Sequence, residues 1–146
     1  MDAHITVLTL GVRDRAASRR FYVDGLGWTP ALDVEDDVVF IRAGHGVILA
    51  LWEVAKLAAE SGTAASHHGT PPISLGHNVG NADEVGEVLD TAVEAGATLI
   101  KPARRQSWGG VSGYFADPDG FLWEVVFNPG LAFDENGDPA FSAIEG

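Results

Sequence analysis

The hydrophobic pattern in the first third of the chain predicts four strands and one helix. Apolar and β-branched residues alternate between Ile5 and Val12, which is typical of a strand. Asp14 is a suitable N-cap for a helix over residues 15–23, whose apolar face includes Phe21. Apolar runs then predict three further strands over residues 28–34, 38–41 and 47–52, with a tight turn at Gly44-His45-Gly46 before the last of them.

The same order of elements returns in the second half of the chain. A strand is expected over residues 73–79, and Asn81 with Glu84 forms a capping box for the helix that follows. The apolar residues of that helix recur at the spacing of one helical face: Val85, Val88, Leu89, Ala92 and Val93. Beyond it we expect a strand over residues 98–100, a long loop over residues 102–110 and a hairpin over residues 114–128.

Each half therefore has the order strand, helix, strand, strand, strand, which indicates an internal duplication. We expect a single domain over residues 1–146, with module one at about residues 4–53 and module two at about residues 73–128. The linker between them, about residues 54–72, is predicted to start as a short helix and to continue as a small, polar loop. Residues 129–146 form a C-terminal tail.

The hairpin over residues 114–128 contains one residue that its pattern does not explain. Its turn is Asp117-Pro118-Asp119-Gly120, in which proline presets φ and glycine accepts a positive φ. In its second strand, residues 121–127, Glu124 is the single polar residue. A carboxylate within a buried strand has to be neutralised, paired or bound to a ligand. The alternative is that Glu124 faces solvent on a half-exposed strand.

This hairpin resembles the closing hairpin of the vicinal-oxygen-chelate superfamily, which includes glyoxalase I, bleomycin-resistance proteins and extradiol dioxygenases. The duplicated unit and the segments Phe21-Tyr22 and Gly25-Leu26-Gly27-Trp28 are similar to the superfamily as well, so the resemblance covers about residues 5–128. It implies an α+β fold in which two tandem βαβββ modules form a curled mixed sheet around a cavity, with the helices outside. It also implies a homodimer.

The resemblance further implies a divalent metal held by side chains on four strands, and this chain departs from that pattern. Glu124 matches the last ligand position, but the other three positions fall near Val7, Leu49 and Ser74. Such metals prefer imidazole or carboxylate ligands, and a shift of one residue in either direction brings none. We therefore expect no metal and no other cofactor.

Composition narrows the remaining classes of function. The chain has no apolar run long enough to span a membrane and no signal-peptide pattern, and it contains no cysteine, so we expect a cytoplasmic protein without membrane contact. The net charge of -12 argues against nucleic acid as a partner. It would favour a cationic ligand through electrostatic steering, or it serves only to keep the protein soluble.

The expected cavity has apolar walls with few polar groups. We place Phe40, Leu49, Leu51, Ser112 and Tyr114 on the same face as Glu124, and the resemblance to fosfomycin-resistance proteins implies that Tyr114 contacts the ligand. Trp108 lies in a loop beside two glycines and could close over a flat ligand, or pack against the linker instead. Trp52, at a strand end, is a second candidate for the rim of the pocket.

The histidines are weaker candidates. His67 and His68 are expected to be solvated in the linker, and His45 to be exposed in its turn. His77 is either a general base or, more in keeping with its place on a strand, a structural residue.

These observations favour a protein that binds a small molecule, resembling the branch of the superfamily that sequesters an aromatic antibiotic without metal. The alternative is a lyase, isomerase or dioxygenase of the same superfamily, with Glu124 as base or ligand and a histidine such as His77 beside it. A third possibility is an accessory protein whose cavity is filled by its own side chains.

Overall fold

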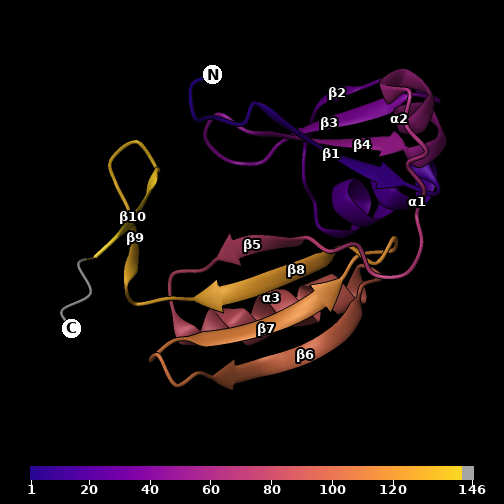
Figure 1. The fold of residues 1–146 in the computed structure, drawn as a ribbon. Coiled ribbons are helices and arrows are strands. Elements are labelled where there is room, and N and C mark those ends of the chain that lie inside the picture. The colour runs from indigo at the N-terminus through magenta and orange to yellow at the C-terminus, as the bar shows by residue number, and fades with distance from the viewer. Residues whose placement is uncertain (143–146) are drawn as a thin grey trace.

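The computed structural model describes residues 1–142 and consists of two four-stranded mixed sheets with the same topology (Figure 1). Module one has the sheet order β1-β4-β3-β2, with β1 parallel to β4 and the other pairs antiparallel. Its elements are β1 (Val7–Val12), α1 (Arg15–Arg19), the π-helical turn η1 (Arg20–Gly25), β2 (Pro30–Asp33), β3 (Val38–Arg42) and β4 (Ile48–Glu53).

Module two repeats this arrangement with the sheet order β5-β8-β7-β6, in which β5 is parallel to β8. Its elements are β5 (Ser74–Asn78), α3 (Ala82–Glu94), β6 (Thr98–Arg105), β7 (Val111–Ala116) and β8 (Leu122–Phe127). The predicted α+β fold of two βαβββ modules is therefore confirmed. The linker begins with α2 (Val54–Ser61), close to the predicted helix.

Two parts of the chain differ from expectation. The segment predicted as a loop after residue 102 continues as strand to Arg105, so β6 is eight residues long. The tail forms a separate hairpin of β9 (Leu131–Phe133) and β10 (Pro139–Phe141), which pairs with neither four-stranded sheet and whose turn places Gly137 beside His45 of module one (Figure 1). Residues 143–146 of the predicted tail lie outside the described residues. Within residues 1–142, no helix is both long and apolar enough to cross a membrane.

Side-chain caps fix the start of the helix in each module. The Asp14 carboxylate accepts a hydrogen bond from the backbone N–H of Ala17 at the start of α1. The Asn81 side chain accepts two from the first turn of α3, and Glu84 accepts one in return from the N–H of Gly80. Such caps satisfy backbone donors that have no partner within the helix, which is why both helices begin where the pattern predicted.

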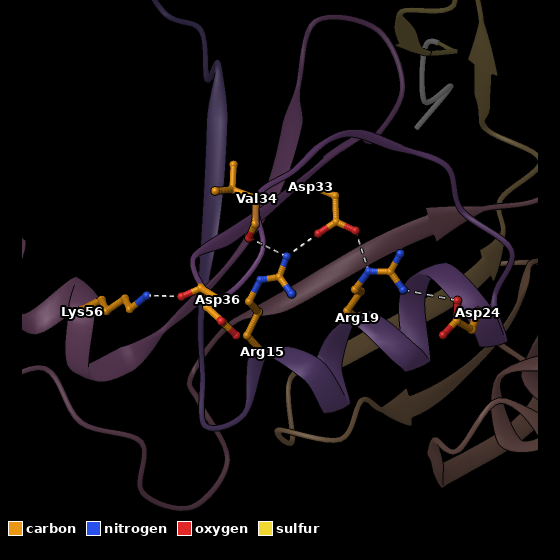
Figure 2. A network of polar contacts seen from close by, with 7 residues as sticks. All are labelled: Arg15, Arg19, Asp24, Asp33, Val34, Asp36 and Lys56. Atoms are coloured by element: carbon orange, nitrogen blue, oxygen red, sulfur yellow. Dashed lines mark hydrogen bonds and ion pairs between the residues drawn. The ribbon is translucent and has the colours of Figure 1, made fainter.

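Ion pairs attach α1 to the sheet of module one (Figure 2). Arg15 and Arg19 both contact the carboxylate of Asp33 at the end of β2, and Arg15 also donates to the carbonyl of Val34. These contacts lower the pKa of Asp33, chiefly through its hydrogen bond with Arg19. Lys56 of α2 reaches the β2–β3 turn at the carbonyl of Asp36, so both helices are held to that turn.

One hydrophobic core joins the two modules. The ring of Phe21 lies 6.2 Å from that of Phe115 in module two, measured between centroids. Nearby, the Tyr22 hydroxyl donates to Oδ2 of Asp117 at 2.6 Å and accepts from Nε1 of Trp123 at 2.9 Å. Burial raises the pKa of Tyr22 well above its ordinary value, and burial also raises the pKa of Asp117. The π-helical turn η1 of module one, which carries Phe21 and Tyr22, thereby packs against residues of module two.

Candidate functional site

Strand alternation places Glu124 on the outer face of the second sheet. Its neighbours in β8, Trp123 and Val125, are buried on the opposite face, in the core that includes residues of α3. Glu124 therefore points away from that helix. It lies opposite Tyr114 of β7 on one side and opposite Gly76 of β5 on the other.

A pocket of about 620 Å³ lies on this outer face. Four residues predicted from the sequence line it together: Trp108, Ser112, Tyr114 and Glu124. The other lining residues come mainly from β6 and the loop that follows it: Ile100, Lys101, Pro102, Arg104, Arg105, Gln106 and Gly113. The pocket thus combines an aromatic edge with charged and hydroxyl groups from adjacent strands.

Trp108 lies at the rim of the pocket, held by a tight loop. The N–H of Gln106 donates to the carbonyl of Gly110, and the N–H of Gly109 donates to the carbonyl of Gln106. The indole ring lies against Gly110, where an added Cβ would come within 1.9 Å of it. With 51% of its surface exposed, Trp108 is not buried as packing against the linker would require. Its ring is available to a ligand.

Tyr114 and Glu124 influence each other across the strand pair. Partial burial raises the pKa of Tyr114, and the neighbouring negative charge of Glu124 raises it further. The phenol therefore stays protonated at neutral pH and is available as a hydrogen-bond donor beside a carboxylate acceptor.

The prediction of one shared face failed in module one. Register pairs Leu49 with Leu8 and Ile41, and pairs Phe40 with Ala50, so Phe40 and Leu49 lie on opposite faces of the first sheet. This is a slip of one residue, which exchanges the two faces of a strand. Leu51 is fully buried in the core and lines neither this pocket nor its neighbour.

Trp52 and Phe40 lie on the outer face of the first sheet, apart from the pocket over the second. Trp52 is partly buried, and its Nε1 donates to Oδ1 of Asp37 at 3.1 Å. Neither side chain is among those that line the pocket around Glu124. The structure therefore brings together the predicted residues of module two and separates those of module one.

A second cavity, about 950 Å³, lies between the two modules and was not foreseen. Trp28, Trp123 and Leu49 contribute to its walls, together with His77 and with Phe133 of the tail hairpin. Desolvation lowers the pKa of His77, which favours the neutral imidazole. Because the walls come from six separate segments of the chain, no local pattern in the sequence could have indicated this cavity.

The residues around Glu124 do not fit the divalent metal that the resemblance implies. Among the described residues, no group of three or more His, Cys, Asp or Glu side chains is placed to hold a metal ion. The cross-strand neighbours of Glu124 are Gly76 and Tyr114, and the counted positions Val7 and Ser74 supply no carboxylate or imidazole.

His67 is not solvated as expected. Its Nδ1 lies 2.9 Å from Nη2 of Arg13, its ring meets that of Phe121 edge to face, and its Nε2 is buried without a partner in the described residues. Arg13 in turn donates its backbone N–H to Asp119 at 2.7 Å. The linker is therefore attached to the Asp-Pro-Asp-Gly turn, away from the pocket around Glu124.

Comparison with known proteins adds family information to this geometry. The model of the Glyoxalase/Bleomycin resistance protein/Dioxygenase superfamily matches residues 3–125. A search of curated proteins found no match.

Several solved structures are also similar to this chain. A glyoxalase-related enzyme from Fulvimarina pelagi is 37% identical with a TM-score of 0.89, over 97% of this chain and 100% of that one. A glyoxalase/bleomycin resistance protein/dioxygenase from Nocardioides is 24% identical with a TM-score of 0.75, over 98% and 91% of the two chains. Lactoylglutathione lyase from Agrobacterium tumefaciens is 21% identical with a TM-score of 0.67, over 88% and 96%. The last two show similarity of fold alone.

Proposed function

Because the chain belongs to the Glyoxalase/Bleomycin resistance protein/Dioxygenase superfamily, we propose that it binds a small aromatic molecule in the pocket over its second sheet. The single observation that carries this proposal is the half-exposed ring of Trp108 at the rim of the pocket that contains Tyr114 and Glu124. The inter-module cavity is larger, and its lining includes Arg42, His77 and Asn78. Trp108, Tyr114 and Glu124 line the smaller pocket and not this cavity. Pockets that bind small molecules combine apolar walls with a few convergent polar groups.

Stacking would supply much of the affinity. Aromatic pairs contribute on the order of 1 kcal/mol beyond the area that they bury. The phenol of Tyr114 and the carboxylate of Glu124 then offer a donor and an acceptor side by side. In this proposal the protein sequesters an antibiotic-like ligand without a metal, and the polar pair sets the ligand's orientation.

Fluorescence titration tests the proposal directly. A panel of polycyclic antibiotics is added to the purified protein, and saturable quenching of tryptophan emission is expected for at least one of them. Trp108→Ala should weaken that binding at least about tenfold, which corresponds to about 1.4 kcal/mol. Trp52→Phe is the matched control, because Trp52 lies on the outer face of the other sheet. Equal affinity in Trp108→Ala and wild type would remove Trp108 from the site.

An enzyme is the second candidate, and one comparison favours it. The structure from Fulvimarina pelagi, 37% identical to this chain, is described as a glyoxalase-related enzyme. The adjacent Tyr114 and Glu124 could exchange a proton with a bound substrate, as general acid and base. Metal analysis and native mass spectrometry of the protein as isolated separate the candidates. A stoichiometric divalent ion would favour the enzyme.

A homodimer is also proposed. Large apolar side chains are exposed on both modules and on the tail hairpin, including Ile5, Leu99 and Phe141. Covering such residues is a common reason for subunit association. Light scattering coupled to size-exclusion chromatography should give twice the mass of one chain, and a monomer at micromolar concentration would contradict it.

A further inference from the structure

The pocket around Glu124 has a charge opposite to that of the protein as a whole. The chain has a net charge of -12 and only 9 lysines and arginines. Three of those nine basic residues line this one pocket: Lys101, Arg104 and Arg105. Glu124 is the only acidic residue among the lining residues, so the basic groups outnumber the acidic group there.

An irregularity in β6 turns two of these basic side chains to the same face. In a regular strand, residues three positions apart point to opposite faces of the sheet. In β6 the register shifts between Lys101 and Arg104, so that Lys101 pairs with Tyr114 and Arg104 pairs with Ser112. Tyr114 and Ser112 are two positions apart and share the outer face. Bulges of this kind redirect side chains and are frequent beside functional sites.

These basic groups have no acidic partner among the residues that the structure describes. Arg15, Arg19 and Lys56 each pair with an aspartate, whereas none of the four ion pairs within residues 1–142 involves Lys101, Arg104 or Arg105. The chain contains 21 acidic residues, more than twice the number of basic ones, so acidic partners are plentiful. Basic side chains left unpaired in such a chain, and gathered at a pocket, are available to an anion from outside.

We propose that the ligand of this pocket is an aromatic oxyanion, a planar ring system that carries a carboxylate or a phosphate-like group. Arg104 and Lys101 would bind the oxyanion next to the Ser112 hydroxyl, and Trp108 would stack on the ring. Glu124, one strand further from β6, would accept a hydrogen bond from a donor on the ligand. This inference rests on the proposed function and reverses the sign of the ligand charge expected from net charge alone.

A series of ligands that share one ring system and differ in charge tests which sign of ligand charge the pocket prefers. Isothermal titration calorimetry compares a naphthalene carboxylate, the corresponding neutral carboxamide and a naphthyl methylamine. The carboxylate is expected to bind about tenfold tighter than the carboxamide, because hydrogen bonds to charged groups are the stronger kind. Its affinity should also fall as salt is added. A naphthyl phosphate, compared with the carboxylate, shows which oxyanion the pocket prefers.

Two substitutions test whether the preference for the carboxylate depends on Arg104. Arg104→Gln should abolish the preference for the carboxylate over the carboxamide. Arg20→Gln removes the same charge from an exposed position on η1, outside the pocket, and should preserve that preference. Thermal melts of both variants verify that they fold.

The outcomes separate this inference from the proposed function. If the carboxamide or the amine binds as tightly as the carboxylate and Trp108→Ala still weakens binding, the aromatic pocket stands and the anion inference is overturned. If no probe binds and the antibiotic panel also fails, the proposed function is overturned together with it. Loss of the preference in Arg20→Gln as well would show a long-range effect of net charge and would overturn the role of Arg104.

Discussion

The two modules share one topology and differ on their outer faces. Glu124 of β8 and Ala50 of β4 occupy matching positions, opposite Gly76 of β5 and Thr9 of β1 respectively. Ala50 is 1% exposed, whereas Glu124 is partly exposed in an open pocket.

Helix α2 explains part of this difference. It packs across the end of β1, where an added Cβ at Gly11 would lie 3.3 Å from Leu57. In module two the matching face carries the loop of Trp108 at its rim, and its centre stays open. Of two repeated units, one covers part of this face with its own chain, and the other leaves a pocket there.

The largest change in stability is expected when a glutamate, the residue of module two, is placed at the matching position of module one. Ala50→Glu would introduce a carboxylate at a position that is only 1% exposed, and the free energy of unfolding should fall by at least about 3 kcal/mol. Glu124→Ala should change it by less than about 1 kcal/mol, because that side chain is partly solvated. Urea denaturation measures both. Comparable effects of the two substitutions would mean that the outer faces do not differ as described.

The turns of the two closing hairpins offer the next comparison. Asp117 is 4% exposed and accepts hydrogen bonds from the N–H groups of Asp119 and Phe121 and from the Tyr22 hydroxyl. Asp117→Ala leaves these buried donors without a partner, so stability should fall by about 3 kcal/mol. His45, exposed in the corresponding turn of module one, should tolerate substitution by alanine with a change below about 0.5 kcal/mol.

The dependence on pH has a definite sign at Asp117. Burial raises the pKa of its carboxyl in the folded protein above the ordinary 3.8, so the folded state holds this proton more tightly than the unfolded chain. The contribution of Asp117 to stability is therefore greatest below about 3.8 and declines as the pH rises through the raised pKa. Asp117→Asn should remove this component from the pH profile of denaturation midpoints, and an unchanged profile would contradict it.

The smallest change in stability is expected when the ion-paired arginines of module one are compared with the unpaired Arg104 of module two. Asp33→Asn should lower stability by at most about 1 kcal/mol, since it weakens the contacts with Arg15 and Arg19. The pKa of Asp33 is lowered, so this stabilisation is present at neutral pH and is lost as the pH falls through the lowered value. Arg104→Gln in module two should leave stability unchanged, because no ion pair of the described residues involves it. Thermal melts of the two variants at neutral and acidic pH measure both changes in stability.

Sequence reasoning reached the fold because its signals were local. Periodicity, caps and turn residues such as Asn81 and the Asp117–Gly120 turn depend on neighbours within a few positions. In module two, the alternation between Glu124 and the buried Trp123 and Val125 also predicted the correct outer face. Four of the eight expected site residues therefore gather in one pocket.

The features that the sequence did not predict depend on contacts between distant parts of the chain. In β4 every residue from Ile48 to Trp52 is apolar, so the pattern could not decide which face Leu49 occupies. The register shift in β6 depends on pairing with β7, and it was hidden within a segment expected to be a loop. The contact of His67 with Arg13 joins residues 54 positions apart. Each of these features requires knowledge of which strand or loop lies opposite.

The hydroxyl of Tyr22 has a consequence for synthesis on the ribosome. Its two partners, Asp117 and Trp123, follow 95 and 101 positions later in the chain. While module one emerges, Trp28 already packs on Tyr22, but the surface that module two contributes around this phenol and Phe21 is still missing. These two apolar side chains are therefore only partly covered until translation is almost finished, and that interval is when a chaperone has most to protect.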